Sequence, residues 1–154
     1  MDAERRLTEL GIDLPAASAP AGLYRPCVRS AGHVYLSGAG PARPDGSYVT
    51  GKVGGAVDVD AARLAARLTG LQLLASLRDE LGSLDRVVRV VKLLGMVNCA
   101  PGFNNTPRVI DGCSELFIEV FGEAGRSARS AVGMAELPFD ICVEIEAIVE
   151  VTNG

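Results

Sequence analysis

The sequence is poor in the residues from which most metal and redox sites are built. Its 154 residues include a single histidine, His33, which excludes a multi-histidine metal site. The four cysteines, Cys27, Cys99, Cys113 and Cys142, stand singly and form no Cys-x-x-Cys pair, so neither a zinc knuckle nor a redox dithiol is indicated. We therefore expect no metal, reduced cysteines in the core, and His33 as a turn or strand-start residue.

Long apolar runs and an excess of positive charge are also missing. No segment approaches the roughly 20 apolar residues of a membrane-spanning helix. The first ten residues, MDAERRLTEL, carry charges where a signal peptide has an apolar run. A formal net charge of −4 and a pI near 5.0 offer no concentrated basic face for nucleic acid. We expect a cytoplasmic protein that binds neither membranes nor nucleic acid.

The chain does have enough apolar residues for one core, since 48% of it is hydrophobic. At this length a single core is stable without disulfides or metal, and no repeat or linker divides the sequence. We predict one domain over residues 1–154, with residues 1–20 as an N-terminal helix and loop extension. Asp2 and Gly11 mark the two ends of that short helix.

Several segments have the composition of strands. Residues 27–31 and 33–38 predict an antiparallel hairpin, and residues 47–50 predict a short third strand. Residues 86–97 form a β-branched run that is apolar at both parities, as in a central strand with two covered faces. Helices of so small a protein cover one face, so we expect another subunit over the other.

Two longer segments have the apolar spacing of three and four that is typical of amphipathic helices. The first spans residues 58–81 and ends at Gly82; the second begins at Thr106, a candidate hydroxyl cap, and ends at Gly122. The positions expected to face the core are Leu64, Leu68, Leu71, Leu74, Leu77 and Leu81 in the first helix and Val109, Cys113, Leu116, Phe117 and Val120 in the second.

Residues 128–137 and 141–151 predict a closing pair of strands, which we interpret as a hairpin. Glu144 and Glu146 share one face of the last strand, opposite a continuous apolar row. The order βββαβαββ predicts an α+β fold with two main helices on one face of a single sheet. Arg129, near the start of this pair, has two interpretations: a surface ion pair with a glutamate, or a carboxylate-binding residue partly desolvated at a subunit boundary.

Several short segments and single residues carry a family resemblance, and they follow one another in order along nearly the whole chain. They are Tyr24, Ser37 with Gly38, residues 51–55, residues 107–122, ARSAV at 128–132, ELP at 136–138 and VEIEA at 143–147. Their order and spacing resemble the RidA (YjgF) family. The resemblance implies a chorismate-mutase-like α+β fold with a single mixed sheet, assembled as a homotrimer with clefts between subunits. It also implies hydrolysis of reactive enamines and imines, such as 2-aminoacrylate, to 2-keto acids and ammonia without a cofactor, as in a 2-iminobutanoate/2-iminopropanoate deaminase.

The resemblance also implies a role for each matching residue. Arg129 would bind the substrate carboxylate through two parallel hydrogen bonds. Glu144 would activate the attacking water as a general base. Tyr24 and Ser37 would line the pocket and relay a proton, and Gly38 would give access to the backbone.

The sequence departs from the family pattern at three pocket positions. Ala39 stands where glutamine is usual, Asp111 where a helix asparagine is common, and Ala131 where cysteine often follows Arg-Ser. The Asp111 and Ala131 positions would still contact the substrate, the latter through its backbone carbonyl. The connection over residues 98–106 is longer than usual, which indicates a divergent subgroup. Two alternatives stay open: a non-catalytic trimer that binds a metabolite as a regulator, and an endoribonuclease, which the acidic composition disfavours.

Overall fold

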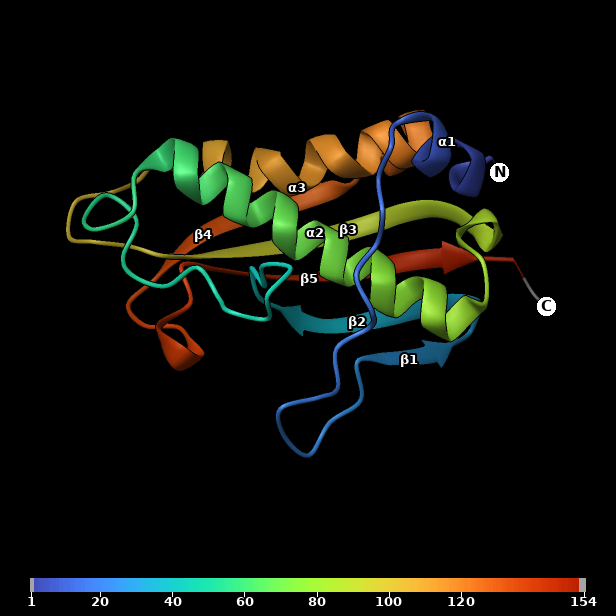
Figure 1. The fold of residues 1–154 in the computed structure, drawn as a ribbon, viewed down its shortest axis with the longest axis horizontal. Helices are drawn as coiled ribbons and strands as arrows, with labels where there is room; N and C mark the ends of the chain where they lie inside the picture. The colour runs from blue at the N-terminus through green and yellow to red at the C-terminus, as the bar shows by residue number, and fades with distance from the viewer. Residues whose placement is uncertain (1, 153–154) are drawn as a thin grey trace.

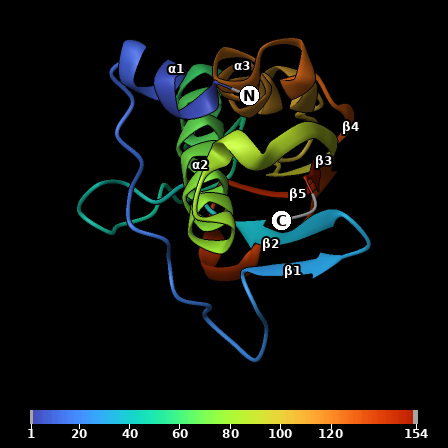
Figure 2. The ribbon, with the colours of Figure 1, turned by 90° about the vertical axis from the view of Figure 1, so that its right-hand side faces the viewer.

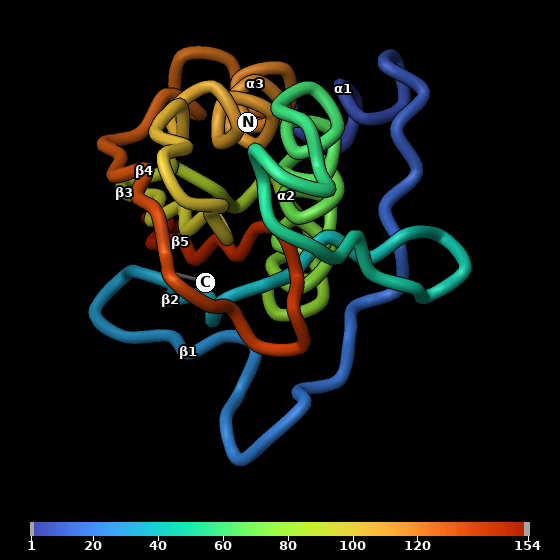
Figure 3. Tube along the Cα trace, turned by 90° about the vertical axis from the view of Figure 1, so that its left-hand side faces the viewer, coloured from blue at the N-terminus to red at the C-terminus, as the bar shows by residue number. Residues whose placement is uncertain are grey.

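The computed structural model describes residues 2–152 as five strands and three α-helices around one sheet (Figure 1). The strands are β1 (Cys27–Ser30), β2 (His33–Ala39), β3 (Val87–Asn98), β4 (Ala128–Met134) and β5 (Val143–Val151). The helices are α1 (Ala3–Glu9), α2 (Val59–Leu81) and α3 (Thr106–Phe121), with short 3-10 turns at Leu84–Arg86, Gly122–Gly125 and Pro138–Asp140. The α+β class with helices on one face is confirmed (Figures 2 and 3).

The strand order is β1-β2-β5-β3-β4, and the predicted hairpin of the last two strands is wrong. β5 lies between β2 and β3 and pairs antiparallel with both, while β4 pairs parallel with β3 at the sheet edge. The sheet is therefore mixed, as the resemblance implies. β5 takes the central place because its alternate residues are fully apolar and bury one whole face of the strand.

The predicted third strand at residues 47–50 does not form. Tyr48 and Thr50 make only isolated bridges, to Ala42 and Ile141 respectively. The segment lies in a long connection with turns at Gly46 and Gly51, both of which have positive φ. These turns change the chain direction on each side of the segment, so its pairing stops at single bridges. The element order is consequently αββαβαββ rather than βββαβαββ.

The buried face of α2 differs from the predicted leucine stripe. Leu64 is 67% exposed, whereas the alanines Ala62, Ala65 and Ala66 are buried. Small residues face α3 because the two helices approach closely: a Cβ on Gly112 would collide with the Arg63 carbonyl. Contact distance therefore decided which face of α2 is buried. Leu74, Leu77 and Leu81 of the predicted stripe are buried as expected.

The apolar stripe predicted for α3 is confirmed, since all five of its residues are buried. The cap is different: Asn105 precedes the helix, and the Thr106 hydroxyl donates to the Ala131 carbonyl at 3.0 Å instead of capping. In α2 the Asp58 side chain accepts from the Ala61 N–H at 2.8 Å, a cap worth about 1 kcal/mol. Gly122 ends α3 as predicted.

The N-terminal extension is tied onto the helical layer. Ala3 and Leu7 of α1 are buried in the core, and Glu4 accepts two hydrogen bonds from Arg78 of α2. From there the chain crosses α2 on its way to β1 (Figure 1). The Ser18 hydroxyl fixes this segment by donating to Gln72 Oε1 at 3.0 Å.

The sheet face opposite the helices carries apolar side chains that nothing among residues 2–152 covers. Tyr35 is 46% exposed and Val132 is 39% exposed on that side. Met96, the register partner of Val132, packs with Leu137 and Ile141 in a small cluster that is already buried. A sheet face of this composition is typical of a surface that another chain covers.

The remaining sequence expectations concern single residues. All four cysteines are free, and three of them are buried; Cys99 is half-buried. His33 is the first residue of β2, with its Nδ1 3.0 Å from the Ala31 carbonyl oxygen. No helix in the described part of the chain has the length and apolar character needed to cross a membrane.

Candidate functional site

Glu144 lies on the uncovered face of the sheet and is half-buried there. It sits on β5 between Val143 and Ile145, which point into the core, and its register partner on β3 is Met96. The Glu144 carboxylate lies against Gly38 of β2: a Cβ at Gly38 would stand 2.5 Å from Glu144 Oε2. Position 38 therefore needs glycine so that the carboxylate can rest on the backbone.

The environment of Glu144 favours its neutral form. Burial raises the pKa of the Glu144 carboxyl above its ordinary value, and the nearby charge of Glu146 raises it further. Glu146 is exposed on the same face of β5. A carboxyl group with a raised pKa holds a proton more readily than a surface glutamate does, which suits it to accept and return a proton.

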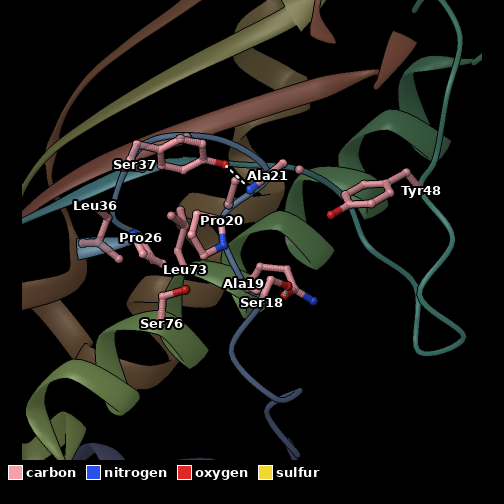
Figure 4. A pocket seen from close by; sticks show the side chains of 15 residues that line it. Ser18, Ala19, Pro20, Ala21, Pro26, Leu36, Ser37, Tyr48, Leu73 and Ser76 are labelled. Carbon is pink, nitrogen blue, oxygen red and sulfur yellow. Dashed lines mark hydrogen bonds between the residues drawn. The ribbon is translucent and has the colours of Figure 1, made fainter. Parts of the chain in front are cut away.

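Ser37 and Tyr24 line a cavity of about 90 Å³ at the end of β2 (Figure 4). The Ser37 hydroxyl donates to the Arg25 carbonyl at 2.6 Å, and the Ala21 N–H donates to the Tyr24 hydroxyl at 3.1 Å. Both hydroxyls thus hold the loop before β1 in place. Gly38 lines the same cavity and also touches Glu144, whereas Glu144 itself is not one of the residues that line the cavity.

Besides Ser18, three further polar residues line this cavity and were not predicted from the sequence. Gln72 and Ser76 come from α2, and Tyr48 comes from the loop after β2. Gln72 is only 8% exposed, and the sequence could have indicated it, because a polar residue on the buried face of a helix usually has a polar partner or a cavity beside it. The other two had no signal, because they join the cavity only through tertiary packing.

Arg129 occupies a separate place, on the helical side of the sheet. Its register partner on β3 is the buried Leu93, and its guanidinium reaches α3. Nη1 donates to Asp111 Oδ1 at 2.8 Å and to Ser114 Oγ at 3.1 Å, while Nη2 lies 3.4 Å from the Pro107 carbonyl oxygen. Ser114 is a contact that the sequence did not reveal.

Asp111 and Arg129 line a pocket of about 400 Å³ beside α3. The interpretation of Arg129 as a cross-strand partner of a glutamate on β5 is wrong, because its ionic partner is Asp111 and β3 separates the two strands. Arg129 and Glu144 lie on opposite faces of the sheet. Within one chain they do not form a single site.

Two family positions next to these pockets have structural contacts. Ala131 packs against the core, and its carbonyl oxygen already accepts the Thr106 hydroxyl. Ala39 also packs against the core at the edge of the 90 Å³ cavity. Residues 2–152 contain no group of three or more histidine, cysteine or carboxylate side chains placed to hold a metal ion.

Comparison with known proteins gives matches over almost the whole chain. The family described as "YjgF/chorismate mutase-like, putative endoribonuclease" matches residues 4–149. Protein TCP17 of Trypanosoma cruzi is 45% identical over 148 residues, which are 96% of this chain and 92% of that protein.

Solved structures show the same architecture. The protein Atu1372 of Agrobacterium tumefaciens, of unknown function, is 45% identical with a TM-score of 0.88, over 97% of this chain and 92% of that one. E. coli TdcF, solved with bound serine, is 26% identical with a TM-score of 0.62, over 89% of this chain and 94% of that one.

Proposed function

This chain belongs to the RidA (YjgF) family, and we propose that it hydrolyses reactive enamine and imine acids to 2-keto acids and ammonia. The observation that carries the proposal is the half-buried Glu144, whose raised pKa and seat on Gly38 suit a general base. Tyr24 and Ser37 line the cavity next to Gly38 and are the candidates for proton relay.

The proposed site lies between subunits of a homotrimer. One subunit would supply Glu144 with Tyr24 and Ser37, and its neighbour would supply Arg129 with Asp111. Two features support this arrangement: Arg129 and Glu144 lie on opposite faces of the sheet in one chain, and apolar side chains line the uncovered face. In the proposed trimer, a closed ring of three identical contacts would bring each Arg129 against the Glu144 of a different chain.

The chemistry needs few groups. An enamine such as 2-aminoacrylate first becomes the imine when its terminal carbon takes up a proton. Glu144 takes a proton from water as the water oxygen attacks the imine carbon, and that proton then passes to the nitrogen. The new hydroxyl then gives its proton to Glu144 as the carbon–nitrogen bond breaks, ammonia leaves with the bonding electron pair, and the carbonyl of the keto acid forms. Arg129 holds the substrate carboxylate and so orients the carbon toward the water.

The relative TdcF supports a small carboxylate-bearing ligand, because its structure contains bound serine. The same fact supports a second candidate function, that of a non-catalytic trimer that binds an amino acid or keto acid. The two functions differ in one respect: only hydrolysis needs Glu144 to exchange a proton. The endoribonuclease activity in the family description is the least supported, since the chain has a net charge of −4.

The test is release of keto acid and ammonia from 2-imino acids generated by an amino-acid oxidase. We expect wild-type protein to speed this release and both Arg129→Ala and Glu144→Gln to lose that acceleration. The matched controls are Arg108→Ala, an exposed arginine paired with Asp60, and Glu150→Gln, on the same face of β5 as Glu144. Equal rates for wild type and Arg129→Ala would contradict hydrolysis. Ligand binding that needs Arg129, with no turnover, would favour the metabolite-binding function.

A further inference from the structure

The guanidinium of Arg129 already donates hydrogen bonds to groups of its own chain. An arginine has five N–H donors. The three bonds to Asp111, Ser114 and the Pro107 carbonyl engage Nη1 and one position of Nη2. Among the described residues nothing accepts from Nε, so Nε and the rest of Nη2 remain for a ligand. A carboxylate that binds there binds directly beside Asp111.

Asp111 is the carboxylate in this pocket that is committed to Arg129. Glu115 lines the same pocket but forms its ion pair with Arg63 of α2, and Arg126 pairs with Glu123. The side chain of Asp111 is 45% exposed, and that of Arg129 is 23% exposed. A ligand can therefore reach both charges of the pair.

Asp111 has one oxygen left for a ligand. Its Oδ1 accepts from Arg129, while Oδ2 accepts no hydrogen bond from any residue that the structure describes. An anion bound to Arg129 is repelled by this carboxylate. A ligand with a protonated nitrogen on the carbon next to its own carboxylate turns the repulsion into attraction, because that nitrogen donates to Oδ2.

We propose that Asp111 sets the ligand preference of the Arg129 site, which selects acids with a positively charged 2-nitrogen, either amino or iminium, over 2-keto acids. The inference rests on the proposed function in one respect, that ligand carboxylates bind at Arg129. It adds the substrate class: the protonated imine rather than a neutral or purely anionic acid. It also gives the site a way to release its product, since hydrolysis replaces the charged nitrogen with a carbonyl oxygen that Asp111 repels.

The experiment compares L-alanine with pyruvate, two acids that share a carbon skeleton and differ at the 2-position. Affinities are measured by titration calorimetry on the wild-type protein and on Asp111→Asn, which keeps the shape and an oxygen for Arg129. We expect wild type to bind L-alanine about tenfold more tightly than pyruvate, the scale of one close charge in a partly exposed site. In Asp111→Asn the preference should disappear or reverse, mainly through tighter binding of pyruvate.

Glu115→Gln is the matched control, because it removes another carboxylate of the same pocket. It should leave the ratio of the two affinities unchanged. The proposal is overturned if wild type binds pyruvate as tightly as L-alanine, if it binds neither, or if Glu115→Gln shifts the ratio as much as Asp111→Asn. If Asp111→Asn folds poorly, the ratio of the wild-type affinities for L-alanine and pyruvate still tests the proposal.

A failure of the proposed function would look different. One outcome is selective binding of L-alanine that is lost in Arg129→Ala, together with no turnover of 2-imino acids. That outcome would contradict the proposed hydrolysis and would still support ligand selection by Asp111. Turnover that depends on Arg129 and Glu144, with equal affinity for L-alanine and pyruvate, would support hydrolysis and contradict ligand selection by Asp111.

Discussion

Arg129 and Glu144 lie on opposite faces of one sheet, on strands that β3 separates. Arg129 is in register with Leu93 on β3, and Glu144 is in register with Met96 on the same strand. The Arg129 guanidinium reaches α3, whereas the Glu144 carboxylate lies against Gly38 of β2. If both act on one substrate, they come from different subunits.

Mixed assemblies of two inactive variants test this directly. Arg129→Ala and Glu144→Gln, each expected to be inactive alone, should regain about one quarter of wild-type activity when co-expressed in equal amounts, because that share of the sites receives both intact residues. The measurement is imine hydrolysis by the purified mixture. Co-expression of Arg129→Ala with Arg129→Lys is the control and should restore nothing. Absence of recovery in a verified mixed trimer would place both residues on one chain's site.

Substitution of Gly38 by alanine tests the seat of Glu144. The new Cβ would stand 2.5 Å from Oε2, so the carboxylate must move. We expect the rate of imine hydrolysis to fall about 100-fold, the cost of misplacing a reacting group by roughly 1 Å. Gly55→Ala is the control, since its nearest neighbour, the Lys52 carbonyl oxygen, is 3.3 Å away. A Gly38→Ala enzyme with normal kcat would show that the position of Glu144 is irrelevant.

The raised pKa of Glu144 predicts the pH dependence of the reaction. The general base must be ionised, so kcat/KM should decline on the acid side around an apparent pKa above the ordinary glutamate value of about 4.5. Removal of the neighbouring charge in Glu146→Gln should move this decline to lower pH. The check is a pH–rate profile of both proteins; a shift toward higher pH would contradict the assigned repulsion.

The same shift predicts the effect of Glu144 on stability. Folding raises the pKa of the Glu144 carboxyl. The stability that this carboxyl contributes is therefore fully present at a pH below its pKa in the unfolded chain, and it is lost as the pH rises through its pKa in the folded protein. Glu144→Gln should therefore raise the melting temperature relative to wild type at pH 7 and make little difference at pH 4. Thermal unfolding at fixed protein concentration measures this. An equal effect at both pH values would mean that ionisation plays no part.

The buried face of α2 predicts opposite results for two leucines of the same expected stripe. Leu74 is 0% exposed, and Leu74→Ala should lower the free energy of unfolding by about 2–5 kcal/mol. Leu64 is 67% exposed, and Leu64→Ala should change it by less than about 0.5 kcal/mol. Urea unfolding at one protein concentration compares them. A large loss for Leu64→Ala would indicate that another subunit covers this position.

The sequence by itself determined both long helices and five of the six expected strands. Apolar periodicity and Gly82 and Gly122 placed both long helices, and the alternation in β5 predicted which side of it is buried. These signals are local, because they depend on the backbone geometry of a few neighbouring residues.

Only the tertiary structure decided where the elements go. The hairpin expected for β4 and β5 does not form, because strand order depends on pairing across long sequence separations, and β5 pairs with β2 and β3 instead. Close packing against Gly112, rather than leucine content, chose the buried face of α2. The same long-range arrangement joined Arg129 to Asp111 and turned Glu144 to the other face, and no spacing along the chain encodes either contact.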